Sequence, residues 1–302
     1  MTETPKKRSI FKRIFLSPTE PRLRAGWRLL LQILFMVIIG LVVGIPAGIL
    51  AMALGIDPGG MLFGQVVQFF VVTGSVFLAV KLLDRRPIAA IGLKLDRWVG
   101  MDILAGIVIT FFMMGSIFAI QLALGWLTFE GFAWQTDPLQ TVLIQTAGAF
   151  VVFLFVGWSE ELLSRGYHLQ TLASGLNLFW GVVISSAVFG LLHLGNPNAT
   201  WLSAAGIFLA GLFLAYGYLT TRQLWLSIGL HIGWNFFEGV GFGFPVSGLD
   251  IYRLTRITVI GPELWTGGAF GPEAGLVVLP GLLLGCALIF LYAKLIRKSI
   301  PA

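Results

Sequence analysis

Charged residues and cysteine are scarce in this 302-residue chain. Only 11% of the residues are charged, whereas an average soluble domain carries roughly a quarter. The single cysteine, Cys286, excludes a disulfide within the chain and a Cys-x-x-Cys metal or redox pair. The chain also lacks a glycine-rich phosphate-binding loop, a low-complexity tract and a convincing internal repeat. Because 57% of the residues are hydrophobic, this composition indicates a membrane protein.

Long apolar runs fill most of the chain. A hydrocarbon core of about 30 Å requires roughly 20 apolar residues per helix, and eight segments meet this length. They lie near residues 28–54, 60–82, 101–126, 139–162, 177–194, 201–220, 224–243 and 274–293. The 38 glycines fit helices that pack closely in lipid. We therefore expect an all-α, polytopic membrane protein with about eight transmembrane helices.

The positive charges are concentrated on one side of this topology. Of the 20 lysines and arginines, only Arg253 and Arg256 fall in loops on the other side. Basic loops stay in the cytoplasm, so we expect both termini to be cytoplasmic. The net charge of +6 then reflects loop bias and predicts no nucleic-acid partner. We expect a basic cytoplasmic segment over residues 1–27 and a single transmembrane domain over residues 28–296, in a multi-pass cell-membrane protein whose short loops favour a bacterial inner membrane.

Two adjacent acids, Glu160 and Glu161, lie within one of the apolar segments. An ionised side chain at membrane depth costs at least ~2.5 kcal/mol, which makes an intramembrane acid a candidate functional residue. Neighbouring residues on a helix point about 100° apart, so both acids cannot face one pocket. Arg165 is four residues after Glu161 and can pair with it. We expect Glu161 and Arg165 to be supporting residues and Glu160 to be the freer carboxylate.

Few other strongly polar groups lie in the apolar segments. His193 ends the fifth, while His231 and Asn235 share one face of the seventh, with Glu238 near that face and without an assigned role. A turn at residues 173–177 would close a hairpin that places Glu160 and His193 at a similar height, roughly 22–27 Å from the turn. His231 reaches that height only if the fourth helix projects about 10 Å from the membrane and the loop 195–200 is submerged.

These side chains suit the activation of a water molecule. Glu160 can act as general base, His193 can orient the water, and His231 with Asn235 can donate hydrogen bonds to an oxyanion. Alternatively, Glu160, His193 and His231 can be three zinc ligands with water in the fourth position. The chain lacks H-E-x-x-H, the zinc-binding sequence of common metalloproteases. Both versions predict hydrolysis of an acyl bond.

Three short sequences, in order on separate predicted helices, resemble the CPBP intramembrane proteases, also called the Abi family. They are Glu160-Glu161-x-x-x-Arg165-Gly-Tyr, Phe189-x-x-x-His193 and His231-x-x-x-Asn235. This family contains the type II CAAX prenyl endopeptidases and bacterial proteins linked to bacteriocin processing and self-immunity. Each sequence alone is weak, but the ordered set within residues 139–243, the expected catalytic core, is specific.

The resemblance implies a glutamate-dependent endopeptidase with an intramembrane site accessible from the cytoplasmic side. Glu160, His193, His231 and Asn235 would be the catalytic residues, with Glu161 and Arg165 supporting them. The family name includes metalloproteases, but two histidines and one available carboxylate make a sparse zinc site, which favours a metal-free mechanism. The expected partners are membrane lipid and a peptide or membrane-protein substrate, and the sequence leaves the oligomeric state open.

Two other functions are compatible with buried acids and histidines. A proton-coupled transporter uses such groups as a relay, although the chain shows no repeat in support of it. A non-catalytic, peptide-binding immunity protein would need the cavity but not the chemistry. Proton-coupled flux that persists in Glu160→Gln would favour the transporter, and immunity that survives Glu160→Ala and His193→Ala would favour the binding protein.

Overall fold

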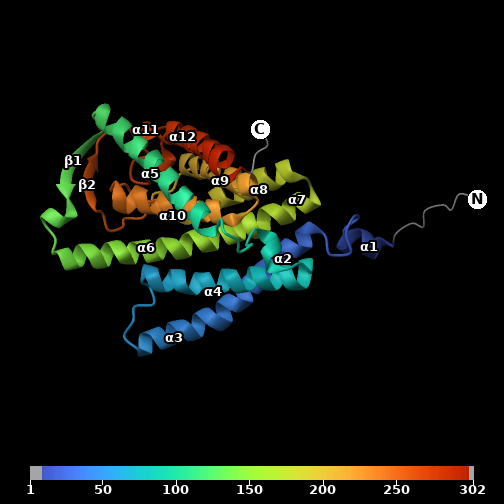
Figure 1. The fold of residues 1–302 in the computed structure, drawn as a ribbon. Helices are drawn as coiled ribbons and strands as arrows, with labels where there is room; N and C mark the ends of the chain where they lie inside the picture. The colour runs from blue at the N-terminus through green and yellow to red at the C-terminus, as the bar shows by residue number, and fades with distance from the viewer. Residues whose placement is uncertain (1–8, 299–302) are drawn as a thin grey trace, which may run out of the picture.

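The computed structural model describes residues 9–298, which fold mainly into helices (Figure 1). Residues 1–8 of the predicted basic segment lie outside the described part. The α-helices are α1 (Ile10–Phe15), α2 (Ala25–Ile39), α3 (Ile45–Ala53), α4 (Met61–Ala79), α5 (Val99–Ala123), α6 (Leu139–Glu161), α7 (Gln170–Gly175), α8 (Leu178–Leu192), α9 (Trp201–Thr221), α10 (Leu224–Asn235), α11 (Glu263–Thr266) and α12 (Val278–Leu291).

Several of these helices continue as π-helix, and short 3₁₀ turns join others. The π-helical segments are η1 (Gly40–Gly44), η2 (Val80–Asp84), η5 (Leu162–Leu169), η7 (Phe236–Gly241) and η9 (Tyr292–Arg297). The 3₁₀ turns are η3 (Ile88–Ile91), η4 (Ala133–Gln135), η6 (His193–Gly195) and η8 (Pro272–Ala274).

Within residues 9–298, seven helices are long and apolar enough to cross a membrane. They cover Ala25–Ala53, Met61–Asp84, Val99–Ala123, Leu139–Gly175, Leu178–Gly195, Trp201–Thr221 and Val278–Arg297. The expected polytopic, helical membrane protein is therefore confirmed, with seven such helices where the sequence suggested about eight. The remaining segment, 224–243, is helical as α10 and η7 but carries polar side chains that reduce its hydrophobicity.

The helix α10 lies at the centre of the protein, between α5 and α6 and against α9 (Figure 1). All of its residues are buried. Gly106 of α5 and Gly229 and Gly233 of α10 make this packing possible, because a Cβ atom at each would collide with the facing helix. The predicted catalytic helix is thus enclosed by other helices, so its polar side chains avoid contact with lipid tails.

The helix that carries the two acids is much longer than a membrane is thick. From α6 through η5 to α7 it runs for 37 residues, or roughly 55 Å. It ends at Gly175, and α8 starts at Leu178 and returns along it, as the predicted turn requires. This length is sufficient for the projection of about 10 Å that the sequence requires to bring His231 level with Glu160.

A two-stranded antiparallel sheet, which the sequence analysis missed, lies at one end of the helices. Its strands are β1 (Leu127–Phe132) and β2 (Thr255–Val259), with Leu127 opposite Val259. Both strands are short, and they come from loops between apolar segments. Because β1 pairs with residues far along the chain, its sequence alone contains little sign of the partner.

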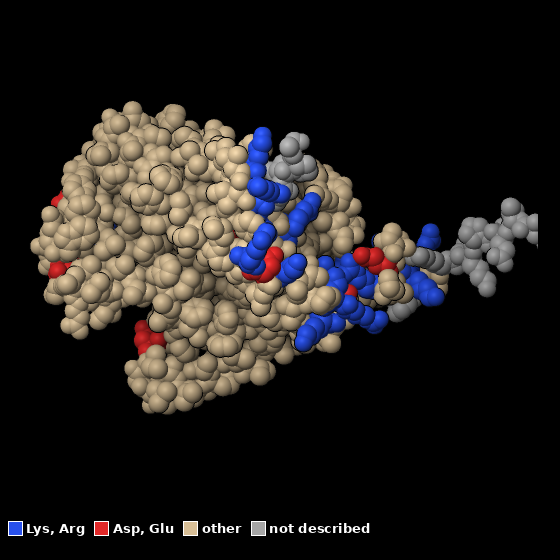
Figure 2. Space-filling view, viewed as in Figure 1, with Lys and Arg blue, Asp and Glu red and all other residues tan. Residues whose placement is uncertain are grey.

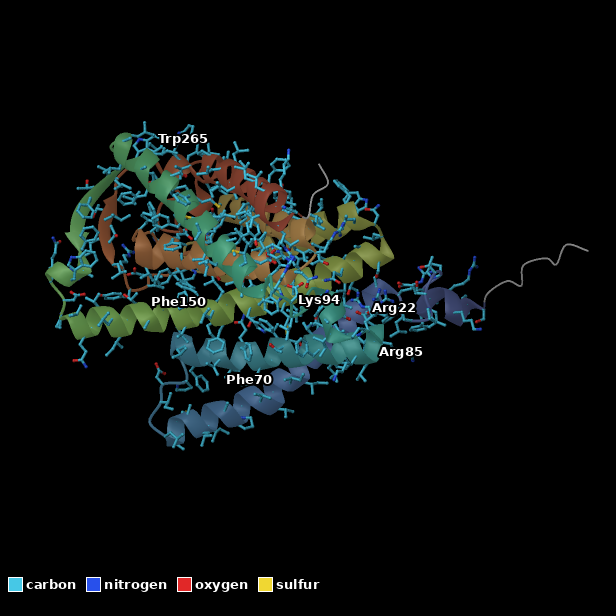
Figure 3. All side chains as sticks on the ribbon, in the orientation of Figure 1. Arg22, Phe70, Arg85, Lys94, Phe150 and Trp265 are labelled. Atoms are coloured by element: carbon cyan, nitrogen blue, oxygen red, sulfur yellow. The ribbon has the colours of Figure 1, made fainter. Side chains whose placement is uncertain are left out.

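The charged side chains separate along the molecule. Figure 2 shows Lys and Arg gathered toward the end where α1 lies, with some Asp and Glu among them, whereas the charged side chains visible at the opposite end are Asp and Glu. In Figure 3, Arg22, Arg85 and Lys94 lie toward the basic end, whereas Trp265 lies near the opposite end. This distribution is the three-dimensional form of the loop bias in the sequence.

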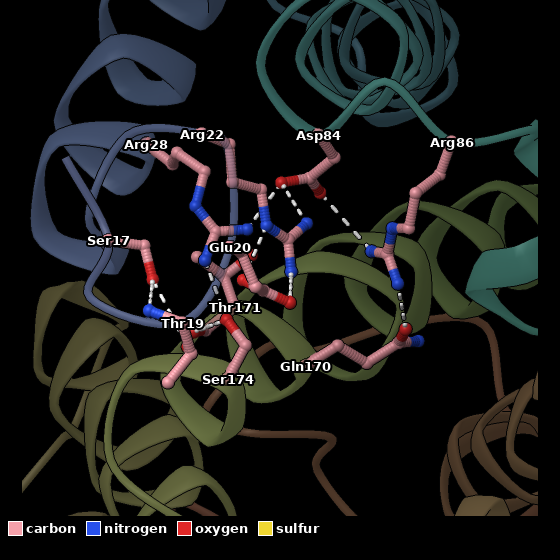
Figure 4. Close-up of polar contacts among 10 residues, drawn as sticks. All are labelled: Ser17, Thr19, Glu20, Arg22, Arg28, Asp84, Arg86, Gln170, Thr171 and Ser174. Atoms are coloured by element: carbon pink, nitrogen blue, oxygen red, sulfur yellow. Dashed lines mark hydrogen bonds and ion pairs between the residues drawn. The ribbon is translucent and has the colours of Figure 1, made fainter. Parts of the chain in front are cut away.

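One buried carboxylate organises the basic end (Figure 4). Asp84 pairs with Arg22 at 3.0 Å, with Arg86 at 3.2 Å and with Arg28. Arg28 also donates a hydrogen bond to the Ser174 hydroxyl at 2.6 Å. These bonds tie α2 to the end of α4 and to α7, and so fix the helix hairpin that packs beside α6.

Candidate active site

A cavity of about 360 Å³ lies among α4, α6, α8, α9 and α10. Glu160, His193, His231 and Asn235, which the sequence identifies as catalytic, all line it. The remaining polar lining residues are Gln65, Gln68, Ser164, Asn196, Ser247 and Glu273. The other walls are apolar, with Phe153, Val156, Phe189 and Trp234 among them. The structure therefore brings residues of three separate helices to one enclosed space.

The two adjacent acids have different surroundings. The Glu160 side chain is 26% exposed and lines the cavity, and its Oε2 has no hydrogen-bond partner among the described residues. The Glu161 side chain is fully buried, and its Oε1 lies 2.8 Å from Nη1 of Arg165. The helix geometry thus separates a carboxylate that lines the cavity from one that is enclosed in the protein interior.

His231 connects the two acids. Its Nδ1 donates a hydrogen bond of 2.8 Å to Oε1 of Glu161, the same oxygen that Arg165 contacts. Its Nε2 faces the other acid, 3.7 Å from Oε2 of Glu160. Since a carboxylate can only accept, Nδ1 carries a proton. The buried Glu161 therefore sets the orientation of the His231 ring, and Nε2 of the ring faces the cavity.

The charges of these groups can balance. Glu160 and Glu161 supply two negative charges, and Arg165 supplies one positive charge. A doubly protonated His231, lying between the two carboxylates, supplies the second positive charge. Balance of this kind matters in a poorly solvated site, because an uncompensated buried charge is very costly. The arrangement accommodates an imidazolium whose Nε2–H points toward the cavity side of the ring.

Phe189 packs against three of these residues. The Arg165 guanidinium lies 4.5 Å from the centre of its ring. The ring centroids of His193 and His231 lie 4.7 and 6.1 Å from the Phe189 centroid. Arg165 also donates a hydrogen bond of 2.9 Å to the Gly211 carbonyl. Phe189 therefore positions the Arg165 guanidinium and both imidazoles. These contacts explain why a phenylalanine stands four residues before His193 in the second short sequence.

His193 is held by the backbone of its own helix. Its Nδ1 lies 2.8 Å from the Phe189 carbonyl oxygen, and since a carbonyl only accepts, Nδ1 carries the proton. The other ring nitrogen of His193, Nε2, has no hydrogen-bond partner within residues 9–298. The loop after His193 is largely exposed but is anchored at one point, where Asn196 donates a hydrogen bond of 3.0 Å to the Ser247 carbonyl.

Asn235 is the last residue of α10, where the helix changes to π-helix. Its side chain is buried, lines the cavity and has no hydrogen-bond partner in the described part of the chain. The same change follows Glu161, where α6 gives way to η5. Single-turn π segments occur often at functional sites, because the wider turn redirects the side chains. The sequence analysis treated both helices as regular and missed this feature.

Glu273 is a cavity residue that the sequence analysis missed. It lies in η8, just before α12, and Oε2 accepts hydrogen bonds from N and Oγ of Ser247 at 2.9 and 2.6 Å. Its carboxyl group interacts electrostatically with His193 and His231. The signal for this residue was an acid placed directly before an apolar segment, but no short sequence around it matched a known pattern.

The sequence offers Glu160, His193 and His231 as possible zinc ligands. Within residues 9–298, no three His, Cys, Asp or Glu side chains come close enough together to hold a metal ion. Zinc requires ligand atoms about 2.0–2.2 Å away in a tetrahedral arrangement. In this arrangement the three residues do not fit a zinc centre, and a chelator test decides whether the reaction uses one.

Comparison with known proteins identifies the segment that carries the site. Residues 142–237 match the family model described as type II CAAX prenyl endopeptidase Rce1-like. The match covers less than half of the chain but includes Glu160, His193, His231 and Asn235. A comparison with the curated proteins gave no match, and neither did a comparison with the solved structures. Residues 142–237, which carry the four candidate catalytic residues, are therefore similar to the Rce1-like type II CAAX prenyl endopeptidases.

Proposed function

We propose that the protein is an intramembrane endopeptidase in which Glu160 activates water for attack on a peptide bond. The observation that carries the proposal is the unequal setting of the two acids. The Glu160 side chain is 26% exposed and lines the cavity, whereas Glu161 is fully buried and its Oε1 is bound by Arg165 and His231. A general base must lie beside the reacting atoms, and of the two acids only Glu160 lines the cavity.

The first step transfers a proton from water to Glu160. As the O–H bond breaks, the water oxygen attacks the carbonyl carbon of the scissile peptide. His193 supports this step with Nε2, which is available because Nδ1 donates to the Phe189 carbonyl. A water molecule held between a carboxylate and an imidazole loses little further entropy on reaching the transition state.

The attack places negative charge on the carbonyl oxygen. Asn235 can donate a hydrogen bond to this oxyanion through its amide, and a doubly protonated His231 can donate another from Nε2. Donors fixed by the protein are effective here, because they need no reorganisation when the charge develops. Glu161 fixes His231, and Arg165 with Phe189 fixes Glu161. The mechanism uses side chains alone.

The cavity indicates the class of substrate. Its walls are mostly apolar and it lies within a bundle of membrane-length helices, which suits a peptide or protein segment that reaches the site from the membrane. The basic end of the molecule supports cytoplasmic termini and a bacterial inner membrane as the location. We propose access from the cytoplasmic side, as the resemblance implies.

Cleavage of a membrane-peptide library by the purified protein tests this function. We expect wild-type cleavage, and a loss of about 10²–10⁴-fold for Glu160→Gln. His193→Ala and His231→Ala should also lose activity. Glu263→Gln is the matched control, since Glu263 is exposed and does not line the cavity. Cleavage that survives Glu160→Gln would overturn the mechanism.

The same assay tests metal use. Wild-type cleavage is measured with and without a tight zinc chelator, and His168→Gln serves as the histidine control. His168 lies outside the cavity, where its Nε2 is hydrogen-bonded to Gln32. Activity unaffected by the chelator supports the metal-free mechanism. Activity lost with the chelator and restored by zinc assigns Glu160, His193 and His231 to a metal.

A further inference from the structure

A second pair of acids lies beside the cavity, and the mechanism above does not use it. Glu238, in η7, is fully buried, and Nε1 of Trp234 donates a hydrogen bond of 3.0 Å to its Oε2. Glu273, in η8, is 4% exposed and lines the cavity. The two acids are 35 positions apart in the chain, so the fold and not the local sequence brings them together.

The two carboxyl groups lie near enough for Glu273 to act directly on Glu238, and Gly271, two residues before Glu273, packs against Oε1 of Glu238. A hydrogen bond between two carboxyl groups requires a proton, because an ionised carboxylate only accepts. Oε1 of Glu238 is buried and finds no N–H or other O–H donor in the described part of the chain. Two adjacent carboxylates in a poorly solvated site also repel each other strongly, so one of them stays protonated. The contacts therefore define a pair that holds one proton.

The surroundings of the pair point toward the candidate active site. Ser247 donates both of its hydrogen bonds to Oε2 of Glu273, and the titratable groups that act on Glu273 from neighbouring elements are His193 and His231. Glu238 is enclosed behind it, against Trp234 and Gly271. Of the two acids, Glu273 alone lines the cavity and can meet a substrate.

Peptide hydrolysis also requires a proton donor for the departing amine, and none of the residues in the mechanism above fills this role. Glu160 takes a proton from water at the start, but the departing amine nitrogen must gain one as the carbon–nitrogen bond breaks. We propose that Glu238 and Glu273 store one proton and that Glu273 donates it to this nitrogen. The inference rests on the proposed peptidase function and adds a catalytic residue outside the matched segment.

The step balances as follows. The water O–H bond breaks, its proton goes to Glu160, and a carbon–oxygen bond forms. The carbon–nitrogen bond then breaks, and the electron pair on nitrogen takes the proton from Glu273, which leaves the acid pair fully ionised. The proton on Glu160 returns to the pair through water in the cavity, so the enzyme is restored.

The test compares two substrates that differ in the leaving group. One is a peptide that the wild-type protein cleaves, and the other carries a 4-nitrophenyl ester at the same scissile carbonyl. An aryl oxide is a stable anion that leaves without a proton, whereas an amine needs one. We expect Glu273→Gln to cleave the peptide about 100-fold more slowly and the ester within about threefold of the wild-type rate. Retained ester cleavage also shows that the variant is folded.

Two further variants complete the test. Glu160→Gln should lose both substrates, because both require activated water, and Glu273→Asp should recover part of the peptide cleavage because it keeps an acid. Peptide cleavage that is unaffected by Glu273→Gln, or an equal loss on peptide and ester, would overturn the inference. A wild-type protein that cleaves neither substrate overturns the proposed function itself, and so the two failures are distinguishable.

Discussion

Nδ1 of His231 donates a hydrogen bond of 2.8 Å to the buried Oε1 of Glu161, which joins the third short sequence of the site to the first. The opposite nitrogen of the ring lies 3.7 Å from Glu160. One imidazole thus connects an interior carboxylate with the carboxylate of the cavity. The ring cannot rotate without losing the bond to Glu161, so the inner acid controls the geometry in which the outer one works.

We predict that Glu161→Gln damages both stability and activity. The substitution removes the charge that faces Arg165, whose side chain is 1% exposed. A buried cation left without its partner costs on the order of 3–5 kcal/mol. Thermal unfolding in detergent should therefore show a large drop in Tm relative to the wild type and to Glu263→Gln. An unchanged Tm would mean that Glu161 does not stabilise Arg165.

We predict that Phe189→Leu lowers kcat with little change in KM. The leucine keeps an apolar group but loses the ring contacts with Arg165 and His193. Such contacts contribute about 1–1.5 kcal/mol, which corresponds to roughly a tenfold change in rate. The control is Phe179→Leu, since Phe179 is 65% exposed. Equal kinetics for the two variants would contradict a positioning role for Phe189.

We predict that Asp84→Asn loosens the basic end of the molecule. Asp84 is buried and pairs with three arginines, one of which, Arg28, is itself buried. The loss of the carboxylate leaves Arg28 without a counter-ion, so Tm should fall. Asp250→Asn is the control, because its partner Arg253 and the Asp250 side chain itself are at least partly exposed. The prediction fails if both variants unfold at the wild-type temperature.

We predict that Asp137, at the end of the molecule opposite to α1, contributes to fold stability in a pH-dependent way. Hydrogen bonds from Arg256 at 2.6 Å, from the Thr136 hydroxyl and from Tyr252 lower the pKa of this carboxyl. A lowered folded-state pKa stabilises the fold above the unfolded-state value, and the stabilisation is lost as the pH falls through the folded value. The Tm difference between wild type and Asp137→Asn should therefore be larger at about pH 6 than at about pH 3. A difference that is independent of pH would contradict this account.

The membrane helices and the first contact of the site could be predicted from the sequence. Apolar runs of membrane length are a strong signal, and Glu161 and Arg165 are neighbours on any helix. The hairpin count also placed Glu160 and His193 together, because a turn and a fixed rise per residue determine relative height. These predictions depend on local geometry, which follows directly from the spacing of residues in the sequence.

The remaining contacts depend on how separate helices pack. The bond between Glu161 and His231 joins residues 70 positions apart, and nothing in either short sequence states that their faces meet. The same holds for Glu238 and Glu273, and for the strands β1 and β2. Seven helices are membrane-length and apolar, and α10, which the sequence counted as another span, is the enclosed one because its polar face needs partners.

The central claim is that Glu160 performs the chemistry while Glu161 supports it. Cleavage rate and Tm, measured together for Glu160→Gln and Glu161→Gln, test this claim most directly. We predict that Glu160→Gln loses cleavage by at least about 100-fold at an unchanged Tm, and that Glu161→Gln loses Tm as well. Wild-type cleavage by Glu160→Gln, or equal losses of cleavage without loss of Tm in both variants, would contradict it.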